Sequence, residues 1–336
     1  MANSDKIRAG RNRTLTVSEE EIPDLKRIIT FPEELSGKSS FVDLLINADA
    51  LTVLDKIPDE CASLIIIDPP YNLSKTFNSS KFNAMSDNMY EEYLRTWFKK
   101  VCDKLKPDGS LYMYMCGDWK CSSSQQKVIS EELTVINRIT WQREKGRGAK
   151  TNWKNAMEDI WFAVKDKDNY YFDVDSVKMK RQVIAPYKEN GKPKDWEETD
   201  EGNFRITFPS NFWDDISIPF WSMPENTDHP TQKPEKLISK LVLASSRPGD
   251  IVLDPFVGSG TTCVVAKKLG RHYLGIEIDE EYCLWAAKRL TRADKDLEIQ
   301  GYNGGFFWER NTLNPQKKST SVKHPRPEEY NQTLFG

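Results

Sequence analysis

The chain has 336 residues, a formal net charge of −3 at pH 7, 38% hydrophobic and 29% charged residues. This composition is typical of a globular protein and excludes one that coats nucleic acid along its whole length. No apolar run approaches the roughly 20 residues that cross a bilayer, and the start lacks the apolar core of a secretory signal. We therefore expect a cytoplasmic protein without membrane contact. Six scattered cysteines and three histidines, with no C-x-x-C pair, predict no metal site.

Apolar strands alternate with helical patterns along most of the chain. Polar residues 1–40 are expected to form an N-terminal arm with one helix near 18–29. After the arm, Asp49 can cap a short helix, and longer helices are predicted at 89–105, at 122–132 and after Pro234. Strands are predicted at 41–47, 64–67, 110–115, 135–142 and 159–165, and 248–290 reads as strand, glycine loop, helix, strand, helix. This alternation indicates an α/β fold with a doubly wound, mostly parallel sheet, a Rossmann-like arrangement.

The periodic pattern disappears over 165–228, where aromatic residues, basic residues and prolines mix without a core pattern. We interpret this stretch as an inserted region between two halves of one domain, 41–164 and 229–310. Residues 311–336 are polar and contain prolines, and they are expected to form a tail.

The stretch "LIIIDPPYNLSK", 64–75, ends a buried strand in Asp68, Pro69, Pro70 and Tyr71. Prolines fix φ and remove backbone donors, so the chain can continue there neither as sheet nor as helix. The strand therefore ends in a rigid group of acceptors, the Asp68 carboxylate and backbone carbonyls, beside an aromatic ring.

A second strand ends in "VLDPFVGSGTT", a glycine loop that opens a helix. Gly258 and Gly260 are expected to allow a tight turn and close approach of a ligand to the backbone. Glu277, at the end of the next strand, is placed to bind two ribose hydroxyls. The third glycine of the dinucleotide fingerprint is absent, and Asp254 at the loop mouth suits a cationic ligand. These residues favour an adenosine-bearing sulfonium cofactor over a dinucleotide.

In a doubly wound sheet, ligands collect at the carboxyl ends of the strands, so the two strand ends should share one crevice. A planar base with an exocyclic amino group fits there. Asp68 and the carbonyl of Pro69 would each accept one amino hydrogen, and Tyr71 would stack on the ring. A base inside a duplex cannot reach such a pocket unless it is flipped out.

These motifs resemble the β-class DNA amino-methyltransferases of restriction–modification systems, which use S-adenosylmethionine. The family's catalytic D-P-P-Y is matched at 68–71, its D-x-F-x-G-S-G cofactor loop at 254–260, and "HPTQKP" stands at 229–234. As in the β class, the catalytic motif precedes the cofactor loop. The resemblance covers about residues 40–295 and implies the methyltransferase variant of the Rossmann-like fold.

By this resemblance, the base is held by Asp68, Pro69, Pro70 and Tyr71. The implied cofactor-binding residues are Asp49, Asp68, Lys233, Asp254, Phe256, Gly258, Ser259, Gly260, Thr261 and Glu277. Asp49 has the simpler alternative of a helix cap, and Lys233 of a helix start.

Double-stranded DNA must meet a locally basic surface of this acidic protein. The basic run 143–154 is interpreted as a loop that contacts the DNA backbone through Arg143, Lys145, Arg147, Lys150 and Lys154. Residues 165–228, which include the basic run 178–194, are the candidate target-recognition region.

The target could be N6 of adenine or N4 of cytosine, since both amines fit the acceptor group. In the family, Ser more often opens the tetrapeptide of cytosine enzymes, so Asp68 favours adenine. More remote alternatives are a non-catalytic DNA-binding protein, a dehydrogenase, and methylation of protein glutamine or RNA. The resemblance also implies a cognate restriction endonuclease in the same system and allows a homodimer.

Overall fold

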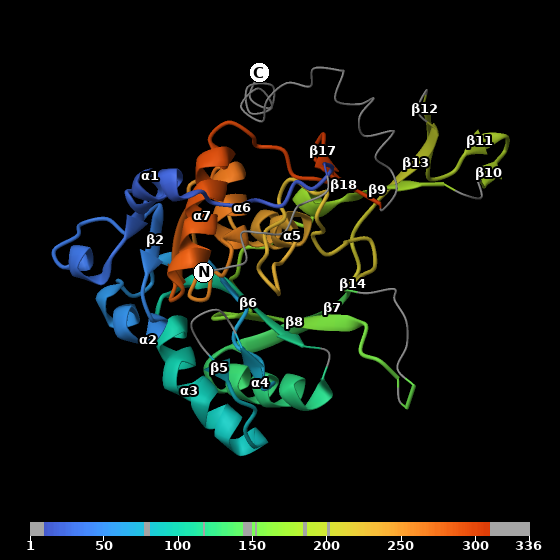
Figure 1. Ribbon diagram of the computed structural model, residues 1–336. Helices are drawn as coiled ribbons and strands as arrows, with labels where there is room; N and C mark the ends of the chain where they lie inside the picture. Colours follow the sequence, from blue (N-terminus) through green and yellow to red (C-terminus); the bar gives the residue numbers. More distant parts are fainter. Residues whose placement is uncertain are drawn as a thin grey trace. The chain divides into compact units, whose positions relative to one another are not determined.

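The computed structural model describes residues 10–76, 81–116, 118–143, 150–151, 153–183, 187–199 and 202–309 (Figure 1). The chain divides into two compact units. The first contains the described residues up to Phe172 together with Asn211–Leu297, and the second contains Asp173–Ser210 and the described residues from Glu298 onward. Among the described residues, every helix is too short or too polar to cross a membrane.

A nine-stranded sheet runs through the first unit in the order β1-β2-β16-β15-β3-β6-β8-β7-β14. Its strands are β1 (Ile29–Thr30), β2 (Leu44–Asn47), β3 (Ala62–Ile67), β6 (Leu105–Cys116), β7 (Thr134–Gln142), β8 (Met157–Val164), β14 (Phe212–Trp213), β15 (Ile251–Asp254) and β16 (His272–Glu277). All neighbours pair in parallel except that β8 is antiparallel to both β6 and β7. The predicted doubly wound, mostly parallel sheet is confirmed. A short hairpin, β4 (Lys75–Thr76) with β5 (Lys81–Phe82), lies outside it.

Helices cover both faces of this sheet (Figure 1). The α-helices are α1 (Ile22–Lys26), α2 (Ala50–Val53), α3 (Asp87–Asp103), α4 (Trp119–Glu132), α5 (Glu235–Ser245), α6 (Thr261–Lys268) and α7 (Glu280–Ala293). Short 3₁₀ turns occupy Glu19–Glu21, Pro32–Leu35 and Leu54–Lys56. Helices α3 and α4 pack together on one face, and α5, α6 and α7 pack in sequence on the other. The central strand β3 is buried along its whole length, which explains its continuous run of apolar residues.

The segment expected to be an N-terminal arm is built into the first unit where it is described. Leu15 is 2% exposed and packs against Tyr282 and Trp285 of α7. The helix expected near 18–29 is shorter in the structure and consists of α1 alone. The chain after α1 forms β1, which pairs in parallel with β2. Leu15 packs against residues more than 200 positions away in the sequence, a contact that local patterns cannot reveal.

The second unit contains a five-stranded sheet in the order β12-β13-β9-β18-β17. Its strands are β9 (Met179–Gln182), β12 (Glu197–Thr199), β13 (Gly202–Thr207), β17 (Tyr302–Asn303) and β18 (Phe306–Trp308), with a 3₁₀ turn at Asp175–Val177 and a separate hairpin of β10 (Lys188–Glu189) and β11 (Lys192–Pro193). The stretch expected to be one inserted region, 165–228, is divided between the two units. Residues 165–172 and 211–228 belong to the first unit, and 173–210 belong to the second, which also contains β17 and β18.

Candidate active site

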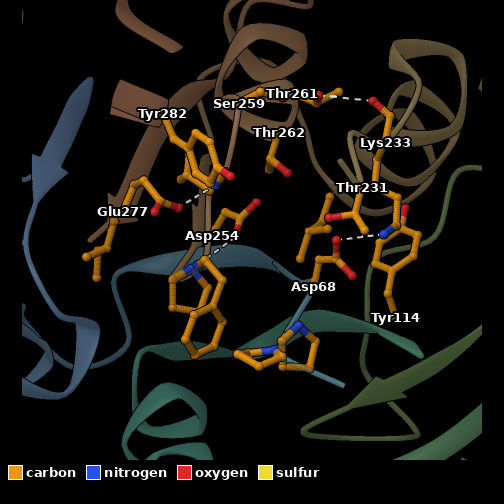
Figure 2. Close-up of a pocket in the computed structure, with 18 of the residues that line it drawn as sticks. Asp68, Tyr114, Thr231, Lys233, Asp254, Ser259, Thr261, Thr262, Glu277 and Tyr282 are labelled. Atoms are coloured by element: carbon orange, nitrogen blue, oxygen red, sulfur yellow. Dashed lines mark hydrogen bonds and ion pairs between the residues drawn. The ribbon is translucent and has the colours of Figure 1, made fainter. Parts of the chain in front are cut away.

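A cavity of about 470 Å³ opens at the carboxyl ends of β3, β15 and β16 (Figure 2). Asp68 follows β3, while Asp254 and Glu277 end β15 and β16, and all three line the cavity. Strand β15 lies between the other two in the sheet, with Leu253 paired to Ile65 and to Leu274. The structure therefore brings the two expected strand ends into one crevice.

The Asp68 carboxylate is held by two short hydrogen bonds. The hydroxyl of Tyr71 donates to its Oδ1 at 2.6 Å, and the ammonium of Lys233 donates to its Oδ2 at 2.6 Å. Lys233 also lies 3.3 Å from the Tyr71 hydroxyl and 5.1 Å from the centre of the Tyr114 ring. Figure 2 shows Asp68 and Lys233 directed toward each other across the cavity.

The loop after Asp68 is held by hydrogen bonds from helices and from its own continuation. The Tyr90 hydroxyl donates to the carbonyl oxygen of Pro70 at 3.1 Å, and Gln125 donates to that hydroxyl at 3.2 Å. Further along, Asn72 exchanges two hydrogen bonds with the backbone of Met85, at 2.8 and 2.9 Å. These contacts hold the loop after β3 in place. The sequence contained no signal for Tyr90 or Gln125, because both look like ordinary residues of amphipathic helices.

Lys233 belongs to a chain of four charged groups. Its Nζ lies 3.5 Å from Oε2 of Glu158, and Oε1 of Glu158 lies 3.0 Å from a guanidinium nitrogen of Arg143. Burial alone would lower the pKa of Lys233, but the carboxylates of Asp68 and Glu158 outweigh it and raise that pKa above its ordinary value. Lys233 is therefore an ammonium at neutral pH. Sequence reasoning missed Glu158, which lies far from every motif.

The glycine loop follows β15 and begins at Asp254, which is 4% exposed. Its Oδ1 accepts a hydrogen bond from the backbone N–H of Phe256 at 2.9 Å, and burial raises the pKa of Asp254 to about 7. The ring of Phe256 packs edge-on against Trp97 at 5.1 Å between ring centres. The loop thus places an acid and an aromatic wall side by side in the cavity.

Both loop glycines have positive φ values, +55° for Gly258 and +86° for Gly260. A Cβ atom on Gly258 would lie 3.0 Å from the ring of His229, which itself contacts Tyr282 at 4.5 Å between ring centres. The predicted tight turn is present at these glycines. The close contact at each one, however, is with the protein's own side chains.

Glu277 connects β16 to the glycine loop. Its Oε2 accepts a hydrogen bond from the N–H of Gly258 at 2.7 Å, and its Oε1 accepts one from the N–H of Asp279 at 2.9 Å. Burial raises the pKa of Glu277 to about 7. Each carboxylate oxygen has a second lone pair, so Glu277 can also accept hydrogen bonds from two hydroxyl groups.

The lining of the cavity fits the cofactor that the motifs imply. Asp49, Asp254, Glu277 and Asp279 supply acceptors and negative charge, and apolar walls come from Leu51, Trp97, Phe256 and Ile278. A sulfonium, an α-ammonium and ribose hydroxyls are cations and donors, while an adenine ring needs apolar faces. Asp49 also caps α2, accepting from the N–H of Leu51 at 2.9 Å, so its helix-cap expectation is confirmed, while its role toward the cofactor stays a prediction.

Ser259 and Thr261 line the cavity, but their polar atoms contact the protein. Arg289 donates to the carbonyl of Ser259 at 2.8 Å and to Oγ1 of Thr261 at 2.9 Å. The Thr261 hydroxyl in turn donates to the carbonyl of Lys233 at 3.0 Å. Arg289, which sequence reasoning missed, also pairs with Glu235 at the start of α5. These contacts fix the glycine loop against the segment that carries Lys233.

The five residues expected to contact DNA are not brought together as one described group. Arg143 lines the cavity and pairs with Glu158, whereas Lys150 and Lys154 are exposed. Lys145 and Arg147 lie outside the described residues.

A family model described as "DNA methylase", for N6 and N4 methyltransferases, matches residues 62–289. Among curated proteins, the chain is 33% identical over 261 residues to the Type II methyltransferase M.HpaI of Haemophilus parainfluenzae, covering 77% of this chain and 76% of that protein. It is 35% identical over 259 residues to the DNA adenine methyltransferase YhdJ of Escherichia coli K12, covering 74% and 83%.

Two solved structures share the fold. The cytosine-N4-specific PvuII DNA methyltransferase is 21% identical with a TM-score of 0.56, covering 73% of this chain and 85% of that chain. The M1.HpyAVI–SAM complex is 24% identical with a TM-score of 0.50, covering 73% and 98%. The family model spans both strand ends of the cavity, Asp68 and Glu277. The chain therefore belongs to the N6/N4 family of DNA methylases and is a DNA methyltransferase.

Proposed function

We propose that this protein methylates the exocyclic N6 amino group of a flipped-out adenine in double-stranded DNA, with S-adenosylmethionine as the methyl donor. The observation that carries the proposal is the shared cavity of Asp68 and the acid-lined glycine loop. When bound, S-adenosylmethionine supplies an electrophilic methyl group, whose S–C bond breaks with its electron pair as the target nitrogen attacks. Glu277 would hold its ribose, Phe256 its adenine, Asp49 its adenine or amino-acid part, and Asp254 its cationic part.

The residues after β3 orient the amine. The Asp68 carboxylate and the carbonyl of Pro69 accept its two hydrogens, while the Tyr71 ring stacks on the base. The Pro70 carbonyl already accepts a hydrogen bond from Tyr90, which supports the Pro69 carbonyl as the second acceptor of the amine. Accepting both hydrogens draws the nitrogen lone pair out of conjugation and toward the methyl group. One proton then passes from the methylated nitrogen to the Asp68 carboxylate, which already accepts its hydrogen bond. Most of the rate gain therefore comes from positioning and preorganised charge.

We infer that the chain belongs to the β class, in which the catalytic stretch comes before the cofactor loop, and the order of its motifs supports this. We also infer that it is the modification enzyme of a restriction–modification system, since M.HpaI is a Type II methyltransferase. The second unit is the candidate recognition region. Its strand β9 carries Lys180, whose ammonium lies 4.5 Å from the centre of the Trp308 ring and 4.8 Å from that of Phe204.

Methylation of cytosine N4 is the second candidate, because the acceptors after β3 fit any exocyclic amine. The likeness to the cytosine-N4-specific PvuII enzyme is a likeness of fold. Adenine is favoured by the similarity to YhdJ and by aspartate at position 68.

The test is to express the chain in a host that lacks endogenous methylation and to digest its DNA to nucleosides for mass spectrometry. We expect N6-methyladenine, confined by single-molecule sequencing to one short motif. Asp68→Ala should abolish the signal, while its affinity for S-adenosylmethionine stays within about tenfold of the parent's. N4-methylcytosine would establish the second candidate, and DNA without either base would overturn the proposal.

A further inference from the structure

Lys233 competes with the target amine for the Asp68 carboxylate. Both carboxylate oxygens already accept bonds of 2.6 Å, Oδ1 from Tyr71 and Oδ2 from Lys233. On the function proposed above, the target amine must share an oxygen with one of these two donors, because each oxygen has only one further lone pair. An ammonium on Oδ2 also withdraws negative charge that should polarise the amine.

A buried acid stands ready to receive the ammonium. Glu158 is 3% exposed, and among the described residues its Oε2 has no hydrogen-bond partner. This oxygen lies 3.5 Å from Nζ of Lys233, whereas a charge-assisted hydrogen bond spans about 2.8 Å. A movement of under about one ångström would therefore transfer the Lys233 bond from Asp68 to Glu158.

The other oxygen of Glu158 is held in place. Arg143 lies 3.0 Å from Oε1, so the carboxylate is oriented with Oε2 toward Lys233. Lys233 is 7% exposed and has little room to turn toward water. Two carboxylates, the half-buried Asp68 and the buried Glu158, thus flank one buried ammonium (Figure 2 shows the Asp68 side).

We propose that Glu158 is a positioning residue that draws Lys233 away from Asp68 when the target amine enters. The ion pair with Asp68 neutralises this half-buried carboxylate while the base is absent. The bond with Glu158 then keeps Lys233 paired while Asp68 binds the amine. Glu158 itself contacts neither base nor cofactor in this role.

The first test measures capture of the amino group without methyl transfer. Two duplexes carry the sequence that the enzyme methylates, one with adenine and one with unsubstituted purine at the target position. The affinity of each duplex is measured for the parent protein and for Glu158→Gln, without cofactor. The ratio of the two affinities reports the amino group, and comparing variants cancels differences in duplex stability. We expect Glu158→Gln to reduce this preference by about tenfold, with little change for the purine duplex. An unchanged ratio would overturn the proposal.

A matched control is Asp159, the next residue in β8, which is also buried. Its Oδ1 accepts a hydrogen bond from the Thr140 hydroxyl at 2.6 Å, and Lys233 is not its partner. Asp159→Asn should keep the ratio within about twofold of the parent's. Glu158→Asp, which keeps the charge, should recover part of the loss. Equal losses in Glu158→Gln and Asp159→Asn would show a merely structural effect.

The second test is a double-mutant cycle on the single-turnover methylation rate. If Glu158 acts only by receiving Lys233, Glu158→Gln should slow the parent about tenfold but slow a Lys233→Met protein less than about twofold. The same loss in both backgrounds would overturn the role of Lys233. A parent protein that fails to methylate DNA would instead contradict the proposed function, so the two failures are distinguishable.

Discussion

A Cβ atom on Gly260 would lie 2.6 Å from the Cβ of Ala286. Gly260 caps α6 in a left-handed conformation, and Ala286 is buried in α7. The glycine is required where the cofactor loop packs against a helix. The sequence motif predicted a tight turn at this glycine and close approach of a ligand. The turn is present, and the close contact that the structure shows is with the protein's own helix.

Gly260→Ala should therefore destabilise the fold as well as weaken cofactor binding. Strain at positive φ and overpacking against Ala286 together should lower the free energy of unfolding by about 2–4 kcal/mol. Gly270 is the matched control, since it also has positive φ, +73°, but nothing lies within 4 Å of its Cβ position. Gly270→Ala should lose only about 1–2 kcal/mol of unfolding free energy, from backbone strain alone. Urea denaturation measures the loss in both variants. Equal losses of stability would remove the packing argument.

Tyr90 is expected to be a positioning residue for the loop after β3. Tyr90→Phe removes the hydroxyl that donates to the Pro70 carbonyl, leaving that carbonyl free to compete with the Pro69 carbonyl for the amine. We expect kcat to fall about tenfold, with the affinity for S-adenosylmethionine unchanged. Tyr112→Phe is the control, because it loses a buried hydroxyl bonded to Ser245 at 2.8 Å. If both variants lose activity equally, Tyr90 acts only through stability.

Cofactor binding should depend on pH because burial raises the pKa of Glu277 to about 7. A protonated Glu277 loses one acceptor position and its negative charge, so ligand affinity should rise with pH. For one group titrating near 7, the affinity should increase about tenfold from pH 6 to pH 8, with protons released on binding. Isothermal titration in two buffers of different ionisation enthalpy measures both. Glu277→Gln should bind weakly and show a smaller rise with pH, the remainder coming from Asp254, and a flat profile in the parent would contradict this reasoning.

The same shifts act on the stability of the ligand-free protein with the opposite sign. Burial raises the pKa of Asp254 as well to about 7, so both acids hold protons in the fold that they lose in the unfolded chain. Their contribution to the free energy of unfolding should therefore be greatest below about pH 4.5 and be lost as the pH rises through 7.

The strand ends of the active site could be predicted from the sequence because their signals are local. Asp68 follows an apolar run and precedes two prolines, and Gly258 and Gly260 follow another. The contact between Lys233 and Glu158 joins residues 75 positions apart on elements that no local pattern relates. Likewise, Leu15 looks like one apolar residue in a polar segment until it packs on α7. Local rules find the motifs, while long-range packing decides which side chains support them.

The last prediction concerns the basic run 143–154, whose described members have different surroundings. Arg143 lines the cavity and pairs with Glu158, while Lys150 and Lys154 are exposed. If the lysines bind phosphates, replacing both with alanine should lower the log–log salt slope of DNA binding by about 0.9 for each phosphate that is no longer neutralised. Specificity should survive, because phosphate contacts carry no sequence information directly.

Arg143→Ala should behave differently, since its partner is a buried acid of the active site. We expect a nearly unchanged salt slope and a fall in kcat, because Glu158 would no longer be oriented toward Lys233 by the guanidinium. Fluorescence anisotropy on cognate and scrambled duplexes across a salt series gives the slopes, and single-turnover assays give the rates. An unchanged slope in the double lysine variant would show that these side chains are only solvated. A slope lowered in Arg143→Ala would instead place its guanidinium on the DNA backbone.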